Sequence, residues 1–562
     1  MATDHSSPFS LARIPSMRLG GRAIRALSSI SRTSLGASLL KKQLADQLGL
    51  AAIARLPESA RGPLVLDPRP IAGRPPRTGA PAANAFVVEN RGWPKTSSWY
   101  REHYESGELT PRAQCEQLLT FAADLEKAMA PSGGPLLERD DAALRRDADA
   151  STRRWAARAP LSPFDGVPFA VKEELDVKGL HTRAGTAFLG ESPAGSDATV
   201  VARLRAAGAI VLGSTPMTEY GMTTFGGNAH RKMPRNPHSP LRGAGGSSTG
   251  SGVAVATGLC PFAIGADGGG SIRIPSAHNG VFGIKPTFGR VSRGGDVFGG
   301  TMDHVGPIAS SVADLARFFD LCAGPDERDS ATGYAPVNHV DFSASLTRGV
   351  AGLRIGLPEE LWADADPAVA KAGRAALASL ERAGAVLVPV DIPLADASTA
   401  IGYLSIALEV FAEMRSFRLE RRSSLSHDFA LFLDTLSALG PADYLDAQRL
   451  RTALRHQTAS AFQSVDLLAL PTTCRPAPPL NDDERASGVL DPANLHANCR
   501  TNMFGNLTGL PAASAPVGSE EGIPIGLQLI GDAWDEPTVL AALATLERTG
   551  AARVVKPLVS VG

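Results

Sequence analysis

Cysteine is scarce in this sequence and follows no disulfide-forming or metal-binding pattern. Five cysteines are scattered over 562 residues, an odd number without a CxxC pair: Cys115, Cys260, Cys322, Cys474 and Cys499. This argues against a disulfide scaffold and favours a reducing compartment. The histidines, cysteines and carboxylates form no group with the spacing of metal ligands, so no metal site is predicted.

Net charge and long apolar runs are lacking as well. The 56 basic and 57 acidic residues give a net charge of −1, which provides no global attraction for nucleic acid. The longest uncharged stretch, between Arg242 and Asp267, has the length to cross a bilayer, but its many Gly and Ser residues are untypical of a transmembrane helix. With 43% hydrophobic and 20% charged residues, the composition indicates a soluble, cytoplasmic globular enzyme without a nucleic-acid partner.

The N-terminal region differs from the rest of the chain. Residues 1–45 carry seven basic residues against Asp4 alone, and leucines recur at helical spacing: Leu35, Leu39, Leu40, Leu44 and Leu48. We therefore predict a basic amphipathic helical extension over residues 1–56. Three interpretations remain open. The helix packs on the body of the protein, lies on a membrane surface as a peripheral contact, or belongs to a transit peptide.

The rest of the chain divides into a linker and one large domain. Prolines recur among Gly and Ala between residues 57 and 95, which is typical of a linker. From residue 96 to about 555, helical and strand patterns alternate, and this alternation predicts the α/β class. The predicted strands are Val167–Val171, Ala209–Leu212, Ala385–Pro389, Leu467–Leu470 and Ile525–Ile530. The predicted helices begin at Pro111 after a Thr110 cap, and include Ala198–Ala207, Asp366–Ala383, much of 400–465 and Glu536–Leu546.

Two Gly-rich loops are the segments best suited to chemistry. Their serines, Ser247 and Ser271, lie 24 residues apart, and the apolar segment Val253–Ile264 between them is predicted to be helical. Glycines allow several backbone N–H groups to converge on an anion, and a serine beside such a nest can act as an acyl-transfer nucleophile. Neither loop has the lysine of a phosphate-binding P-loop.

Two other interpretations of these loops are weaker. Gly246-x-Ser248-x-Gly250 matches the nucleophile elbow of α/β-hydrolases, but that motif needs a strand immediately before it. The residues from His238 onward read as coil. Flexible Gly/Ser linkers would explain either loop alone, but not two such loops on either side of an apolar segment.

A serine nucleophile needs a base, and Lys172 is the better candidate than any histidine. It ends the apolar strand-like run GVPFAVK, whereas the histidines fall in unrelated contexts. Burial at a strand end would favour the neutral form of the amine, which can accept a proton. A solvated surface charge is the alternative for a lysine in this position.

Several motifs together resemble the amidase signature family of serine amide hydrolases. They are GVPFAVKEELDVKG, GGSSTGS, GADGGGSIRIPS and GIKPTFGRVS, with supporting matches from about residue 160 to 545. Within the family the chain is most similar to fatty acid amide hydrolases of the plant type, on the segments ASTRRW, NPHSPLR, ADYLDAQRLR and the N-terminal SLGASLLKKQL. The resemblance implies an α/β fold with a central mixed β-sheet covered by helices on both faces, and an N-terminal helical extension.

The resemblance also assigns roles to residues. It implies a triad in which Ser271 is the nucleophile, Ser247 a bridging serine after a cis peptide bond, and Lys172 the base. The oxyanion hole would be built from backbone N–H groups of Gly268, Gly269, Gly270 and Ser271. Supporting residues would be Ser248, Asp267 and Arg273, the last two as a brace for the nucleophile loop. Asn506-Leu-Thr508 matches a glycosylation sequon, and we interpret it as a chance match.

The expected reaction is hydrolysis of carboxylic amides through an acyl-enzyme, without cofactor or metal. The expected substrates are fatty acid amides such as N-acylethanolamines, with the N-terminal extension contacting a membrane surface. The alternatives are a general aryl or short-chain acylamidase and an amidotransferase component that releases ammonia from glutamine. The resemblance suggests a homodimer, and we expect the acyl-chain pocket to involve the helical region around 400–450.

Overall fold

The computed structural model describes residues 7–14, 16–31, 33, 49–75, 93–336, 340–437 and 439–560. A ten-stranded mixed sheet runs through the molecule and confirms the predicted α/β class. Its strands, in spatial order, are β3 (Ile210–Thr215), β2 (Pro168–Lys172), β4 (Phe262–Ala266), β6 (Val305–Ala309), β5 (Phe282–Lys285), β11 (Ala512–Glu520), β12 (Ile523–Gly531), β9 (Leu467–Pro471), β7 (Arg354–Leu357) and β8 (Val386–Pro389).

Parallel pairing is confined to the two ends of this sheet. Strand β2 pairs in parallel with both β3 and β4, and β7 pairs in parallel with β8 and β9. The strands between them, from β4 to β9, pair antiparallel. Because β2, β3 and β4 run in the same direction, their carboxyl ends meet at one edge, where the loops that follow them can form a site.

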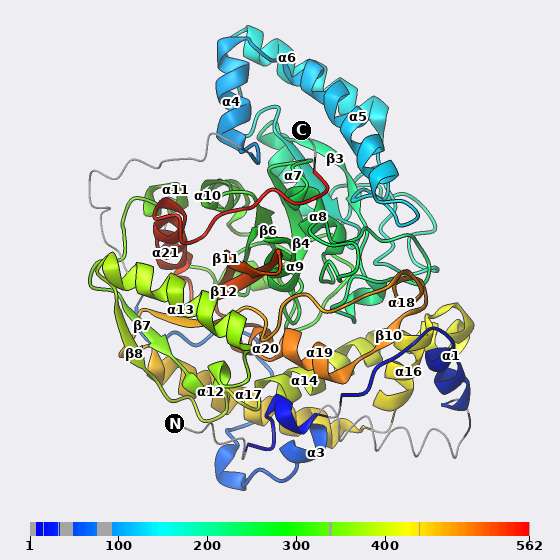
Figure 1. Cartoon of the computed structure of the whole chain (residues 1–562), viewed down its shortest axis with the longest axis vertical. Helices are drawn as coiled ribbons and strands as arrows, with labels where there is room; N and C mark the ends of the chain where they lie inside the picture. Colours follow the sequence, from blue (N-terminus) through cyan, green and yellow to red (C-terminus); the bar gives the residue numbers. More distant parts are fainter. Residues whose placement is uncertain are drawn as a thin grey trace.

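Helices cover both faces of the sheet, as expected (Figure 1). On β12, Gly526 faces Ala277 of α9 (Arg273–Asn279), and Gly531 faces Val539 of α21 (Glu536–Arg548). These two glycines are an odd number of residues apart on one strand, so they point to opposite faces. Helices α9 and α21 therefore lie on opposite sides of the sheet.

The other helices complete the two layers and one protruding end. Figure 1 shows α4, α5 and α6 at one end of the molecule, and α14, α16 and α17 at the other. The bounds are α4 (Ser97–Ser106), α5 (Pro111–Ala128), α6 (Asp141–Ala156), α7 (Thr199–Ala206), α8 (Thr249–Ala256), α10 (Val312–Cys322), α11 (Phe342–Ser345), α12 (Glu359–Trp362), α13 (Pro367–Arg382), α14 (Ser398–Glu413), α15 (Arg415–Glu420), α16 (His427–Leu436), α17 (Pro441–Ala461), α18 (Asp482–Ser487), α19 (Pro492–Cys499) and α20 (Asn502–Thr508).

Most predicted elements are observed within a few residues of their expected ends. The Thr110 hydroxyl accepts the N–H of Ala113, and Pro111 occupies the first turn of α5, as the capping pattern predicts. The predicted helix at Ala198–Ala207 corresponds to α7, and the predicted strand at Ala209–Leu212 corresponds to β3. The helical region around 400–465 contains α14 to α17.

The apolar segment Val253–Ile264 is not one helix, and this prediction is wrong. Helix α8 ends at Ala256, and strand β4 begins at Phe262. Gly258 lies between them with φ of 76°, a left-handed conformation that ends a helix readily at glycine. Pro261 then breaks any helical continuation, so the second half of the segment joins the sheet. Apolar character alone could not distinguish a buried helix from a buried strand here.

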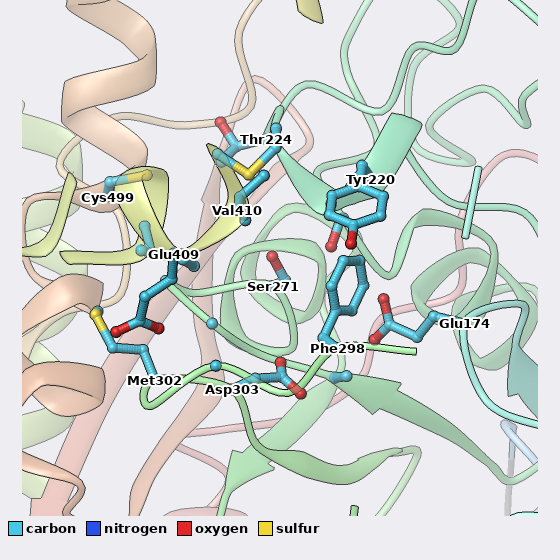
Figure 2. Close-up of a pocket in the computed structure, with 18 of the residues that line it drawn as sticks. Glu174, Tyr220, Thr224, Ser271, Phe298, Met302, Asp303, Glu409, Val410 and Cys499 are labelled. Carbon is cyan, nitrogen blue, oxygen red and sulfur yellow. The ribbon is translucent and has the colours of Figure 1, made fainter. Parts of the chain in front are cut away.

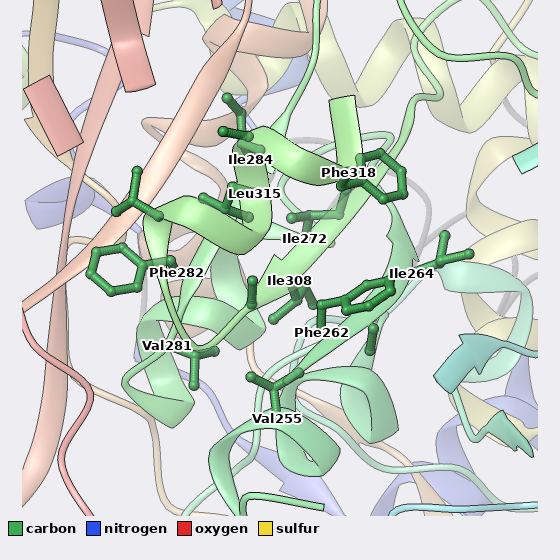
Figure 3. Close-up of a cluster of buried hydrophobic side chains, with 14 of the residues drawn as sticks. Val255, Phe262, Ile264, Ile272, Val281, Phe282, Ile284, Ile308, Leu315 and Phe318 are labelled. Carbon is green, nitrogen blue, oxygen red and sulfur yellow. The ribbon is translucent and has the colours of Figure 1, made fainter. Parts of the chain in front are cut away.

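Aromatic and branched side chains fill the core under β4, β5 and β6 (Figure 3). Phe262 stacks on Phe164 and Phe169, with ring centroids 4.6 and 5.4 Å apart. Burying one side chain of this size contributes about 1.5–3 kcal/mol. The packed core fixes the direction in which β4 ends, and so the place of the loop that carries Ser271.

The described part of the N-terminal extension lies against the body of the protein. Strand β1 (Leu19–Gly20) pairs with β10 (Val489–Leu490), and α1 (Gly21–Ile30) contacts α16. Arg18 forms ion pairs with Glu484 at 2.8 Å and Asp491 at 2.5 Å. The predicted amphipathic helix with leucines from Leu35 to Leu48 lies outside the described residues.

Part of the predicted linker can also be followed. Residues 57–75 run along the body, where Gly62 N–H donates to the Arg449 carbonyl at 3.1 Å and Gly73 N–H donates to Asp532 at 3.0 Å. Residues 76–92 lie outside the described part. None of the helices formed by the described residues is long and apolar enough to cross a membrane.

Candidate active site

Lys172 is the last residue of β2, and the fold brings it to the first serine loop. Its Nζ lies 2.9 Å from Ser247 Oγ and 3.2 Å from the Ala266 carbonyl oxygen. Ala266 is the last residue of β4, so the parallel ends of two strands deliver both groups. Lys172 is only 1% exposed, which rules out a solvated surface charge.

Ser247 lies in a loop and is followed directly by α8. The residues from His238 to Gly246 contain no strand, so the geometry of a nucleophile elbow at Ser248 is absent there. The peptide bond between Gly246 and Ser247 is cis, as the resemblance implies.

Ser248 ties the two serine loops together. Its Oγ donates to the Ala266 carbonyl at 3.2 Å, and the Ala266 N–H donates back to it at 3.3 Å. Its own N–H donates to the Ser271 carbonyl at 3.2 Å. Ser248 therefore holds the first loop against the end of β4 and against the second loop.

Ser271 lies between the end of β4 and the start of α9, in a loop of three glycines. Its side chain reaches the same cavity as Ser247 and Lys172, and the residue is 8% exposed. Gly270 has φ of 122°, a backbone conformation that favours glycine. A Cβ on Gly268 would lie 2.7 Å from Ile406 Cδ1, so the loop runs directly beneath the side chains of α14.

One of the four predicted oxyanion donors is already engaged. The N–H of Gly270 donates to Asp267 Oδ1 at 2.7 Å, so it is not directed at the cavity. The N–H groups of Gly268, Gly269 and Ser271 have no acceptor among the described residues. Three backbone donors are therefore left to meet a developing oxyanion.

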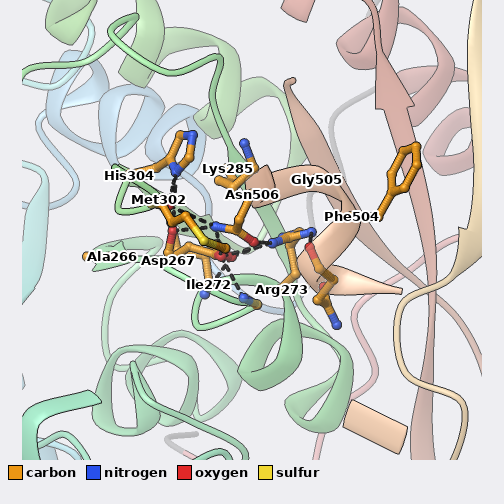
Figure 4. A network of polar contacts seen from close by, with 12 residues as sticks. Ala266, Asp267, Ile272, Arg273, Lys285, Met302, His304, Phe504, Gly505 and Asn506 are labelled. Carbon is orange, nitrogen blue, oxygen red and sulfur yellow. Dashed lines mark hydrogen bonds and ion pairs between the residues drawn. The ribbon is translucent and has the colours of Figure 1, made fainter. Parts of the chain in front are cut away.

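Asp267 and Arg273 form a buried brace for the loop that carries Ser271 (Figure 4). Both side chains are 0% exposed, and Arg273 Nε and Nη2 donate to the carboxylate at 3.0 and 2.9 Å. Asp267 also accepts the N–H groups of Gly270 and Ile272, which flank Ser271. Burial alone would raise the pKa of Asp267, but the Arg273 guanidinium and the hydrogen bonds to the carboxylate lower it well below its usual range.

Two residues distant in sequence complete this brace, and the sequence analysis did not assign them a role. Asn506 Nδ2 donates to Asp267 Oδ1 at 2.9 Å, and Arg273 donates to Asn506 Oδ1 and to Gln528 Oε1, both at 2.5 Å. Asn506 is fully buried, so the folded protein leaves no room for a glycan on this side chain. The motifs NLTGLP and GLQLIG, which contain Asn506 and Gln528, were the signals in the sequence.

A partly enclosed cavity lies beside Ser271 (Figure 2). Helix α14 supplies Tyr403, Ile406, Glu409 and Val410 to its wall, which agrees with the expectation that the region around 400–450 contributes to the pocket. Its apolar lining further includes Met222, Phe298, Met302, Leu495 and Met503. Among the described lining residues there is no histidine, and Lys172 is the one basic side chain.

Glu174, which the sequence analysis also missed, lies directly beside Lys172. Its Oε1 is 3.0 Å from Lys172 Nζ, and its side chain is 1% exposed. Burial raises the pKa of Glu174 to about 7, although the charge of Lys172 lowers it. Burial likewise raises the pKa of Asp303, which lines the same part of the cavity. In the sequence, the signal for this contact was the pair of consecutive acidic residues that follows Lys172.

The arrangement suits acyl transfer by a serine and a lysine. It combines a hydroxyl nucleophile, a buried amine within hydrogen-bond distance of a second hydroxyl, and free backbone donors beside the nucleophile. No group of three or more His, Cys, Asp or Glu side chains within the described ranges is arranged to hold a metal ion.

Comparisons with known proteins agree with this chemistry. A family model described as Amidase matches residues 122–540. The chain is 36% identical over 429 residues to a component of the glutamyl-tRNA(Gln) amidotransferase of Chloroflexus aurantiacus, covering 71% of this chain and 86% of that protein. It is 35% identical over 459 residues to a fatty acid amide hydrolase of Medicago truncatula, covering 80% of this chain and 75% of that protein.

Solved structures give the same result. A bacterial aryl acylamidase of the amidase signature family superposes with a TM-score of 0.73 at 26% sequence identity, over 82% of this chain and 96% of that chain. The match of the family model over most of the chain, the two relatives and the shared fold lead to one conclusion. The chain belongs to the amidase signature family of enzymes, which hydrolyse amides.

Proposed function

We propose that this amidase hydrolyses fatty acid amides, such as N-acylethanolamines, to a free fatty acid and an amine. The apolar wall of the cavity beside Ser271 carries this proposal. Met222, Phe298, Ile406 and Met503 present thioether, aromatic and aliphatic groups to it. Such a wall gains free energy by removing an acyl chain from water, at about 0.8 kcal/mol for each buried CH₂ group.

In the proposed acylation step, Ser271 Oγ forms a bond to the carbonyl carbon of the amide. The electron pair of the C=O bond moves to the oxygen, which the N–H groups of Gly268, Gly269 and Ser271 stabilise. The Ser271 proton moves to Ser247, whose own proton moves to the neutral amine of Lys172 2.9 Å away. The proton then returns through Ser247 to the leaving nitrogen as the C–N bond breaks.

Deacylation follows the same relay in the proposed mechanism. Water attacks the acyl carbon of the Ser271 ester, and its proton passes through Ser247 to Lys172. Collapse of the tetrahedral intermediate breaks the ester bond, and Ser271 recovers its proton. Apart from the substrate and the attacking water, both steps use only groups of the chain, because its hydroxyls and one amine relay every proton.

Release of ammonia from glutamine is the first alternative, and the charges of the cavity disfavour it. Glutamine carries an α-carboxylate that needs a cationic partner when it is desolvated. The one basic side chain in the described lining is Lys172, which is the proposed base. The lining carboxylates Glu409 and Glu413 would repel this group rather than bind it.

A panel of amides tests the proposal. The purified chain is assayed on N-acylethanolamines of short to long acyl chain, on aryl anilides of short acids, and on glutamine. We expect the highest kcat/KM for long acyl chains, and loss of activity in Ser271→Ala. A preference for short anilides would support the aryl acylamidase alternative, and ammonia release from glutamine alone would support the amidotransferase alternative.

We further propose that the basic N-terminal extension contacts a membrane surface, from which lipid amides would be captured, and that the chain forms a homodimer, as the family resemblance suggests. Flotation of the full chain with phosphatidylcholine vesicles, compared with a variant that lacks residues 1–48, tests the membrane contact. Analytical ultracentrifugation of the full chain tests the homodimer. Binding to vesicles that survives the deletion would contradict a role for the N-terminal extension.

A further inference from the structure

Glu174 has no assigned role in the mechanism above, yet it is in direct contact with the base. We propose that Glu174 is the positioning residue of Lys172: its carboxylate keeps the amine directed at Ser247 and stabilises the ammonium that forms when the proton arrives. This inference rests on the proposed amide hydrolysis by Ser271, Ser247 and Lys172.

The number of hydrogen-bond acceptors around Lys172 supports this role. Its Nζ has three neighbours at hydrogen-bond distance, namely Ser247 Oγ at 2.9 Å, Glu174 Oε1 at 3.0 Å and the Ala266 carbonyl at 3.2 Å. A neutral amine has two N–H donors and one lone pair. If one donor binds the Ala266 carbonyl and the other is turned toward the Glu174 carboxylate, the lone pair faces Ser247, from which the proton must come.

The same three neighbours also match the protonated state. An ammonium has three N–H donors; Ser247 Oγ and the Ala266 carbonyl are hydrogen-bond partners of Nζ, and the Glu174 carboxylate lies 3.0 Å away as an ion pair. The carboxylate contributes the only negative charge among them, in a site where both side chains are at most 2% exposed. An opposite charge at this distance in a desolvated site stabilises the ammonium more than it would in water.

Glu174 is free to serve Lys172 because nothing else engages its carboxylate. Neither of its oxygens accepts a hydrogen bond from a described residue, and the 3.0 Å approach of Lys172 Nζ to Oε1 is an ion-pair contact. The preceding acid, Glu173, is engaged elsewhere, since Arg231 pairs with it and the Met217 N–H donates to it at 3.1 Å. The turn after β2 therefore directs one of the two consecutive acids to the base and the other away from it.

The remaining titratable groups around Glu174 are named by the elements that carry them. Tyr220 lies in the loop after β3, and Asp296 and Asp303 lie in the loops between β5 and β6. Burial raises the pKa of Asp296 well above its usual range, and the charge of Asp303 raises it further. Burial also raises the pKa of Asp303, which the cations Arg293 and Lys172 lower. Glu174 is thus the carboxyl group in contact with the base, and the other two act on it through space.

The substitution Glu174→Gln tests the proposal because it keeps the size of the side chain and one oxygen acceptor. It removes the negative charge that stabilises the ammonium. We expect kcat to fall about tenfold to a hundredfold, less than the loss of ~10²–10⁴ expected for removing a general base. KM should change by less than about threefold, since Glu174 stabilises the protonated base rather than the bound substrate.

The pH profile separates this role from a merely structural one. The proposed role requires the ionised form of Glu174, whose pKa burial raises to about 7, so removing this carboxyl group should move the acidic limb of the kcat profile to lower pH. Glu174→Asp keeps the charge and should restore most of the limb position. The surface variant Glu105→Gln, on an exposed face of α4, controls for handling of the protein.

Each outcome bears on one claim. A wild-type chain that hydrolyses no amide of the panel would overturn the proposed function, and with it the role of Glu174 in that reaction. An active wild type whose acidic limb is unchanged in Glu174→Gln would overturn the role of Glu174 alone. If circular dichroism shows that Glu174→Gln does not fold, the Glu174→Asp variant tests the proposal instead. An acidic limb at the wild-type pH supports the proposal, and a limb displaced by more than about one pH unit contradicts it.

Discussion

The buried ion pair beneath the nucleophile gives the sharpest stability prediction. Arg273 is fully buried and donates to Asp267, Asn506, Gln528 and the Asn502 carbonyl. Arg273→Met replaces the guanidinium by an apolar chain of similar length. It leaves Asp267 as a buried carboxylate without its cation, and removing one partner of a buried pair costs about 3–5 kcal/mol. We expect the free energy of unfolding to fall by this amount at pH 8.

The loss should depend on pH with a defined sign. In the wild type the pKa of Asp267 lies below its unfolded value, so the pair stabilises the fold fully above about pH 4 and loses this contribution only as the pH falls further. In Arg273→Met, burial without the guanidinium raises the pKa of Asp267 above its unfolded value. The folded variant then binds a proton more readily than the unfolded chain, so its stability rises as the pH falls from 8 to 5.

Urea unfolding at pH 8 and pH 5, followed by tryptophan fluorescence, measures both effects. Arg145→Met is the matched control, because Arg145 pairs with Glu116 at 2.8 Å on the surface, where both side chains are more than a third exposed. The control should lose less than about 1 kcal/mol. A loss in Arg273→Met as small as that of the control, or one that grows as the pH falls, would refute the reasoning.

Three further substitutions are predicted from the same geometry. Lys172→Ala should lower kcat by about 10²–10⁴ with little change in KM, and an equal loss through KM alone would argue against its role as base. Gly270→Ala places a Cβ 2.6 Å from Ile274 Cδ1 at φ of 122°. Thermal unfolding should therefore show a free energy of unfolding lower by about 1–3 kcal/mol, together with a lower kcat. An unchanged melting temperature would contradict this prediction. Ile406→Trp places a larger side chain in the apolar wall of the cavity. The value of kcat/KM should fall at least about tenfold for long acyl chains and change little for short ones. A uniform loss over all chain lengths would contradict the acyl-chain pocket.

The central elements of the site could be predicted because local sequence determines them. Glycines mark the two loops, the apolar run before Lys172 marks a strand end, and parallel strands bring such ends together. These features marked Lys172 and the two serine loops as candidates, whereas the contact between Lys172 and Ser247, observed at 2.9 Å, was implied by the family resemblance. Strand and helix positions follow in the same way from periodicity and from caps such as Thr110.

The other contacts of the site could not be predicted, because they depend on side-chain directions and on distances in space that the periodicity of the sequence does not determine. The turn after β2 decides that Glu174 faces Lys172 while Glu173 faces Arg231. Asn506 reaches Asp267 across 239 residues of sequence, and no local pattern marks such a contact. The break of Val253–Ile264 into a helix and a strand depends on the backbone at Gly258, and apolar character is the same on both sides.

Covalent labelling of the nucleophile tests the central claim most directly. The wild type and Ser271→Ala are incubated with a long-chain alkyl fluorophosphonate, and intact mass spectrometry followed by peptide mapping locates the adduct. The account predicts one adduct per chain, on Ser271, formed more slowly with a short-chain probe and absent from the variant. An adduct on Ser247 or Ser248, or equal labelling of the variant, would contradict the assignment of Ser271 as the nucleophile.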